Sequence, residues 1–441
     1  MIYDEGTHLG FIQIYSHTLS PYTTETPGNM TTQISLFHYL LSFIYRFMDF
    51  LGASQMTIII TLRLLNIAMV AVGILIYAKL MTYLRVRTIY INVGLLLFVL
   101  LPIVPFVAAT INYDNMLFPA VAAYLYLCVK YIKEKNPSAL SLMLLFAVGL
   151  LATLIKFVFL PMLAATLLVL LVIQFKRYKI KTIFDSTKKS FKEGRKSWVV
   201  GVFFGITLLT TCALYGVNLI KYHSVSPSCF KVQSVQQCMR NGVIARNETA
   251  KNTVNERIAM RPDDFISKIW IDQMVGNTLW SGNSTSRGTI ETKGPLPIME
   301  MLLFFGTLGG LGLLIYEWKS MRRDFAWKFL VLTALFWVFV IFIVNVQTYY
   351  KLHEAFAIQP RYLLIILPIL LVAVVYAASL ATGGRKWVKL TCLFTILLLF
   401  TQGGGVITHI VDSEDSWYWS NDSVQRINTT VRDGLRPLVK E

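Results

Sequence analysis

Two adjacent carboxylates near the start of the sequence are the first residues that can do chemistry. Asp4 and Glu5 are followed by His8, and on a helix Asp4 and His8 would share a face. A partly buried carboxylate makes a reasonable general base, because burial raises its pKa toward neutrality. Taken alone, a solvated charged terminus is the simpler interpretation. A metal site is less well supported, because Asp and His form an incomplete ligand set and no HExxH motif is present.

Four further sites place polar or charged residues at the ends or turns of apolar segments. Asp114 lies in an NYDN turn, Lys156 interrupts a long apolar run, and Gln359 and Arg361 precede a late apolar segment. Arg63 lies near the start of the first such segment. Arginine binds phosphate oxygens through a planar fork, and a lysine among apolar residues is costly unless it snorkels or meets an anion. The alternatives are an ordinary polar turn for Asp114, snorkelling for Lys156 and lipid anchoring for Arg361.

A polar region at 221–296 contains the other candidates. Its segment DDFISKIWIDQMVGNTLW predicts a helix with Asp263 or Asp264 as the N-cap. Within that helix, Trp270 and Trp280 can stack on sugar faces, although tryptophans more often pack in a loop core or anchor at a membrane interface.

Cys229 and Cys238 are the two cysteines outside the apolar segments, with eight residues between them. Such a pair can close a small loop in an oxidising compartment. We therefore expect a disulfide bond, with two free thiols as the alternative.

The elements that must position these residues are membrane helices. The chain has 441 residues, of which 55% are apolar and 15% charged, whereas a soluble domain carries about 45–50% and about 25%. This composition excludes a cytosolic enzyme and a disordered chain, and five cysteines are too few for a secreted disulfide scaffold. Windows of about 19 residues predict ten spans. They lie at 57–79, 90–110, 114–131, 138–155, 157–175, 198–220, 297–316, 327–346, 360–380 and 388–407.

The basic residues are concentrated in five short loops between these spans. The loops hold 22 of the 41 basic residues and five of the 24 acidic ones, so they account for the whole net charge of +17. By the positive-inside rule, these loops are cytoplasmic and both termini are extracytoplasmic in the cell membrane. The basic balance therefore implies no nucleic-acid partner.

The spans divide the chain into five regions. Residues 1–56 form an extracytoplasmic acidic loop and a helix at 33–50 that we expect in the membrane interface, with a first transmembrane span as the alternative. Six spans occupy 57–220, an extracytoplasmic loop 221–296, four spans 297–407 and an extracytoplasmic tail 408–441. The predicted fold class is an all-α polytopic membrane protein with about ten transmembrane helices.

Six motifs follow one another along the chain: an acidic Asp-Glu-x-x-His loop, SLFHYLLSF, RLLNIAMVAVGILIYAKL, NYDN, LLATLIKFVFLPML and PRYLLIILP. This order resembles the C-type (GT-C) superfamily of membrane glycosyltransferases, particularly its bacterial members. The resemblance implies inverting transfer of a hexose or pentose, on the outer face of the membrane, from a polyprenyl-phosphate sugar to a glycan, lipid or protein acceptor of the cell envelope. Asp4 or Glu5 would be the base and Asp114 a second acidic residue, while Lys156 and Arg361 would hold the donor phosphate.

The sequence leaves the cofactor, two alternative functions and the start of the chain open. No cofactor is predicted with certainty, and a divalent cation stays open. A lipid-linked sugar transporter and a non-catalytic envelope or assembly protein are the alternatives, although transporters usually place ionisable residues at the bilayer midplane between internal repeats. Family members place a transmembrane helix before the acidic loop, so either the start is truncated or Asp4 and Glu5 lie on a fraying terminus.

Overall fold

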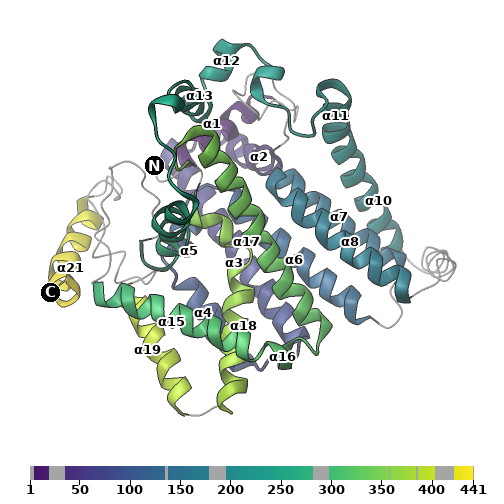
Figure 1. Ribbon diagram of the computed structural model, residues 1–441. Helices are drawn as coiled ribbons and strands as arrows, with labels where there is room; N and C mark the ends of the chain where they lie inside the picture. The colour runs from purple at the N-terminus through teal and green to yellow at the C-terminus, as the bar shows by residue number, and fades with distance from the viewer. Residues whose placement is uncertain are drawn as a thin grey trace. The chain divides into compact units, whose positions relative to one another are not determined.

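The computed structural model describes residues 4–18, 35–134, 138–177, 195–281, 297–356, 358–383, 386–402 and 422–440. These residues form helices and connecting turns, and no strand occurs among them (Figure 1). The predicted all-helical class is therefore confirmed. The chain divides into two compact units, each assembled from separate stretches of sequence.

The first unit comprises 1–83, 108–259 and 329–354. Its helices are α1 (Glu5–Ser16), α2 (Leu36–Phe50), α3 (Gln55–Tyr83), α6 (Tyr113–Lys133), α7 (Ala139–Ile155), α8 (Leu160–Arg177), α10 (Arg195–Thr211), α11 (Val217–Tyr222), α12 (Val235–Met239), α13 (Gly242–Asn252) and most of α17 (Phe325–Leu352). The helix α3 packs along α6, which in turn packs on α7. Gly73 allows the α3–α6 approach, because a Cβ atom there would overlap the ring of Phe118.

The second unit comprises 84–107, 260–328 and 355–441. Its longer helices are α4 (Thr88–Val99), α15 (Pro297–Tyr316), α18 (Leu367–Thr382), α19 (Lys386–Gln402) and α21 (Asp422–Lys440). The helix α18 packs against both α4 and α15. Gly94 of α4 lies so near α18 that a Cβ atom would come within 2.8 Å of the Cα atom of Val372. A larger residue at position 94 would push these two helices apart.

Five helices are long and apolar enough to cross a membrane. They are Gln55–Tyr83, Tyr113–Lys133, Phe157–Lys176, Ser197–Tyr222 and Phe325–Leu352. Five shorter apolar helices of 10–17 residues occupy Thr88–Val99, Ala139–Ile155, Phe304–Tyr316, Leu367–Thr382 and Lys389–Thr401. Helices thus occur at the ten predicted positions, while ten spans stay a prediction. Phe304–Tyr316 is part of the 20-residue α15, and the other four shorter helices extend at most about 26 Å at 1.5 Å per residue, less than a hydrocarbon core of about 30 Å.

The helix predicted at 33–50 is α2, and it has two different faces. His38 and Ser42 face the interior of the unit with Phe37, Leu41 and Tyr45, which all are buried. Four large apolar side chains, Leu40, Phe43, Phe47 and Phe50, are exposed, together with Asp49. A largely apolar outer face is typical of a helix that contacts lipid, while the polar side chains of His38 and Ser42 lie on the inner face.

The helix predicted from DDFISKIW begins earlier than expected. It starts with Pro262, and Arg261 occupies the N-cap position without a side-chain hydrogen bond. Asp263 and Asp264 therefore lie in the first turn, and the prediction that one of them caps the helix was wrong. Proline favours the first helical position because its fixed φ suits a helix and it has no N–H to satisfy there.

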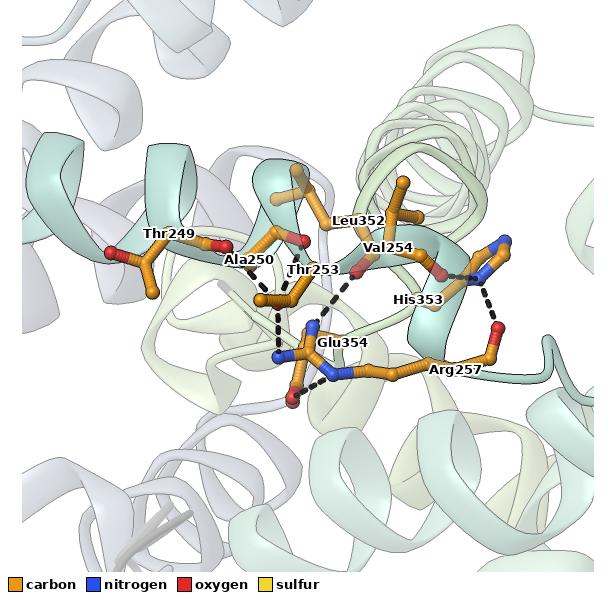
Figure 2. A network of polar contacts seen from close by, with 8 residues as sticks. All are labelled: Thr249, Ala250, Thr253, Val254, Arg257, Leu352, His353 and Glu354. Atoms are coloured by element: carbon orange, nitrogen blue, oxygen red, sulfur yellow. Dashed lines mark hydrogen bonds and ion pairs between the residues drawn. The ribbon is translucent and has the colours of Figure 1, made fainter.

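Two attachments hold the chain that follows α11. A disulfide bond joins Cys229 to Cys238, with the Cα atoms 5.8 Å apart. The second attachment connects the turn after α13 to the end of α17 (Figure 2). There, His353 Nδ1 lies 2.9 Å from the carbonyl oxygen of Arg257 and 3.2 Å from that of Val254. The Arg257 guanidinium pairs with Glu354 at 3.3 Å and donates to the hydroxyl of Thr253 at 2.9 Å.

Candidate functional site

The two predicted carboxylates have different surroundings. Asp4 occupies the N-cap position of α1 and is half-buried, whereas the side chain of Glu5 is fully buried. Arg63 on α3 donates from Nε to one Glu5 oxygen at 2.8 Å and from Nη2 to the other at 2.6 Å. The backbone N–H of Ile111 adds a third hydrogen bond, at 3.1 Å. These contacts hold Glu5 in place, so it does not lie on a fraying end.

One turn further along α3, Asn66 fixes the NYDN turn. Its Oδ1 atom accepts from the backbone N–H of Asn112 at 3.3 Å and from Nδ2 of Asn115 at 3.0 Å. Asn112 in turn caps α6, because its side chain accepts from the N–H of Asp114 at 2.9 Å. A single turn of α3, from Arg63 to Asn66, therefore positions both the acidic N-terminal helix and the turn that carries Asp114.

Asp114 forms a buried ion pair with Lys156. The Lys156 ammonium lies 2.5 Å from Asp114 Oδ1, and neither side chain is more than 8% exposed. Lys156 lies in the break between two helices: α7 ends at Ile155, Lys156 has an extended backbone, and the 3₁₀ helix η2 (Phe157–Phe159) leads into α8. The same ammonium lies 4.5 Å from the ring centre of Tyr113. The attraction between the two charges offsets part of the free energy that burying each of them costs.

A pair of histidines lies next to this ion pair. His8 Nδ1 and His38 Nε2 are 2.8 Å apart, and the two rings stack with their centres 5.0 Å apart. Burial lowers the pKa of His38 to about 3, so its ring is neutral at physiological pH. The ring of Tyr113 packs edge-on against His8 at 4.7 Å. Tyr113 thus joins the histidine pair to Lys156.

The other predicted residues belong to the second unit. Gln359 precedes a short 3₁₀ helix, η8 (Pro360–Leu363), in which Arg361 is only 2% exposed and lies 5.8 Å from the ring of Tyr362. The segment η7 (Asp272–Ser281) packs against η8. Trp270 is half-buried at the end of η6 (Phe265–Trp270), and Trp280 lies within η7 with its side chain outside the described residues.

The structure therefore unites most of the predicted site. Its first unit gathers Asp4, the Glu5–Arg63 pair and the Asp114–Lys156 pair near the two stacked histidines His8 and His38. The sequence marks Asn66 as a polar residue one turn after Arg63, but the contacts that it makes come from the structure. Only packing reveals that His38 faces His8 and that Tyr113 lies against both. In the described parts of the chain, no group of three or more His, Cys, Asp or Glu residues could hold a metal ion.

Asp4 and Glu5 differ in their ability to accept a proton from a ligand. Both oxygens of Glu5 already accept strong hydrogen bonds, and the buried side chain has no surface on which to meet a substrate. Asp4 is partly exposed at the end of the same helix. Asp4 is therefore the better placed of the two to accept a proton from a ligand, and Glu5 is better described as a residue that positions α1.

No protein-family model, curated protein or solved structure matches this chain. The fold by itself defines a helical protein with five helices that are long and apolar enough to cross a membrane. An activity must therefore be inferred from the candidate site.

Proposed function

We propose that this chain is a membrane glycosyltransferase that moves a sugar from a polyprenyl-phosphate donor to an acceptor of the cell envelope, with inversion at the anomeric carbon. The supporting observation is the cluster in the first unit, where the half-buried Asp4 adjoins the Glu5–Arg63 pair and the same helix, α3, positions the turn of the Asp114–Lys156 pair. Carboxylates and cations among membrane helices suit a reaction between a polar acceptor and a lipid phosphate.

In this proposal Asp4 is the base. Its carboxylate takes the proton of the acceptor hydroxyl while the hydroxyl oxygen forms a bond to the anomeric carbon. The bond between that carbon and the phosphate oxygen breaks, and the electron pair leaves with the polyprenyl phosphate. Glu5 supports the reaction indirectly, because its contacts with Arg63 and Ile111 fix the start of α1.

The donor phosphate requires a cation, and Lys156 supplies one in the first unit. Its ammonium already contacts Asp114, so a phosphate that reaches it would share or displace that carboxylate. Arg361 as a phosphate ligand, and Trp270 and Trp280 as sugar contacts, belong to the second unit and stay predictions from the sequence, so the proposed transfer rests on the residues of the first unit.

The proposal includes ten membrane spans, with both termini and the 221–296 loop on the extracytoplasmic side. Exposed serines provide a matched test, since Ser267 lies in the outer loop and Ser320 in a basic loop of the predicted cytoplasmic side. In intact cells, Ser267→Cys should react with an impermeant maleimide and Ser320→Cys should react only after permeabilisation. The opposite pattern would reverse the orientation.

Transfer of radiolabelled sugar from a panel of polyprenyl-phosphate sugars by the purified full chain tests the activity. Asp4→Asn should lower turnover by about 10²–10⁴-fold with donor binding little changed, because only proton acceptance is lost. Lys156→Ala should instead weaken donor binding. Asp49→Asn, which changes an exposed carboxylate on α2, is the matched control and should leave turnover unchanged.

Three results would contradict the proposal in different ways. Unchanged transfer by Asp4→Asn would place the base elsewhere, with Asp114 as the next candidate. Donor binding that is unaffected by Lys156→Ala would remove the phosphate role. A parent chain that elutes as one species and transfers none of the sugars would favour the non-catalytic envelope protein, or a transporter if it moves the lipid-linked sugar across vesicles.

A further inference from the structure

The last described helix, α21 (Asp422–Lys440), separates apolar from polar side chains along its length. Val424, Ile427, Val431 and Leu435 recur every three or four residues, and this spacing places them on one face. Three of these side chains are strongly exposed: Val424 by 46%, Ile427 by 67% and Val431 by 40%. A row of exposed apolar residues at helical spacing marks an interaction surface.

The opposite face of α21 is polar and also exposed. Asp422 and Arg426 belong to it, and the side chain of Asp433 is 59% exposed. A helix with one apolar and one polar face, and with little hydrophobic character overall, is the type that lies flat in a membrane interface. Such a helix leaves its polar face in water and inserts its apolar face among the lipid chains.

The sequence next to α21 indicates the same partner. Trp417, Tyr418 and Trp419 come shortly before the helix, and tryptophan and tyrosine are the residues enriched at membrane–water interfaces. The helix also follows α19, one of the apolar helices of the chain, so a bilayer lies within reach of this tail. A docking site for another protein would not require this aromatic run.

We infer that the apolar face of α21, formed by Val424, Ile427, Val431 and Leu435, docks into the bilayer interface beside the membrane helices. The partner is the lipid surface itself. The inference does not depend on the proposed glycosyl transfer, because it concerns a surface remote in sequence from Asp4, Asp114 and Lys156.

Spin-label accessibility in the full chain tests this docking. The free cysteines Cys128, Cys212 and Cys392 are replaced by alanine, the Cys229–Cys238 pair is kept, and one cysteine is introduced at a time. Ile427→Cys and Val431→Cys probe the apolar face, and Asp433→Cys is the matched control on the polar face. Each labelled protein is placed in nanodiscs of phosphatidylethanolamine and phosphatidylglycerol, and relaxation by oxygen, which concentrates in lipid, is compared with relaxation by a water-soluble nickel chelate.

We expect oxygen to dominate at 427 and 431 and the nickel chelate to dominate at 433. Dominance of the chelate at all three positions would overturn the inference, because the helix would then lie in water. Low accessibility to both reagents at 427 and 431 would overturn it too, and would indicate a protein contact. Dipolar broadening that vanishes on dilution with unlabelled protein would identify that contact as a second copy. If the Ile427 variant does not elute as one species, Val424→Cys replaces it.

Discussion

Arg63 holds Glu5 through two parallel hydrogen bonds of 2.8 and 2.6 Å, although the two residues are 58 positions apart in the sequence. The Glu5 side chain is completely buried, while that of Arg63 remains 31% exposed. The two residues therefore differ in what happens when the partner is removed. Water can solvate the Arg63 guanidinium if Glu5 is lost, but it cannot reach the Glu5 carboxylate if Arg63 is lost.

Loss of Arg63 should therefore destabilise the protein more than loss of the Glu5 charge. Arg63→Gln leaves a buried carboxylate without its cation, which costs roughly 3 kcal/mol, whereas Glu5→Gln leaves an arginine that can reach water. The double variant, Glu5→Gln with Arg63→Gln, should unfold at a higher temperature in detergent than Arg63→Gln alone. Equal losses from both single variants would show that the pair acts symmetrically and that the exposure of Arg63 is irrelevant.

The buried histidine pair should make stability depend on pH. The pKa of His38 is about 3 in the folded protein, below the value of about 6.5 for an exposed histidine. Unfolding therefore takes up a proton between pH 6.5 and pH 3, so the stabilisation is complete above about pH 6.5 and is lost as the pH falls. At pH 5 the loss relative to pH 7.5 should be about 2 kcal/mol.

His38→Gln isolates this contribution, because glutamine can still donate toward His8 but does not titrate. Chemical unfolding of both proteins at pH 7.5 and pH 5 should show a smaller acid loss for the variant, while carboxylates affect the two proteins alike. His8 and Tyr113 contact the His38 ring directly, so neither residue is substituted in this comparison. Identical pH dependence in the two proteins would assign the acid sensitivity to groups other than His38.

The Cys229–Cys238 bond closes a loop of ten residues. Such a loop constrains the unfolded chain by roughly 2–3 kcal/mol in the chain-entropy model. Alkylation of the purified protein without reductant should therefore modify neither cysteine, and the mass should rise by two labels at these positions after reduction. Labelling of both without reductant would show two free thiols. Cys229→Ser with Cys238→Ser should selectively increase hydrogen exchange in α12.

The contact of Arg257 with the end of α17 should stabilise the turn after α13 (Figure 2). His353 has a left-handed backbone with φ of 50°, which most side chains adopt only at a cost of about 1–2 kcal/mol, so its ring contacts must compensate. We expect His353→Ala and Arg257→Ala to increase hydrogen exchange over 242–258. His353→Asn should be milder, since asparagine tolerates this conformation and keeps an N–H donor.

Arg261→Ala provides the control for these variants. The pair of Arg261 with Asp263 is highly exposed, at 79% and 66%, and surface pairs contribute little. Hydrogen-exchange mass spectrometry should find no change over 242–258 in that variant. No increase in any of the four variants would mean that the turn is held by backbone contacts alone.

The sequence by itself determined the helical class, the positions of the apolar helices and most of the charged residues of the site. These follow from local properties: the hydropathy of about 20 consecutive residues, and the single charge at Lys156 that interrupts a long apolar run. Local signals also had limits, as the start of the outer-loop helix at Pro262 shows.

Only the tertiary structure decided which charges neutralise each other. Nothing in the spacing of residues 5, 63, 114 and 156 states that Arg63 takes Glu5 and that Lys156 takes Asp114. That choice depends on the packing of α3 against α6, on the turn held by Asn66 and on burial, which sets the cost of each unpaired charge. The same packing brings His38 against His8 across 30 residues and leaves Asp4, rather than Glu5, with access to solvent.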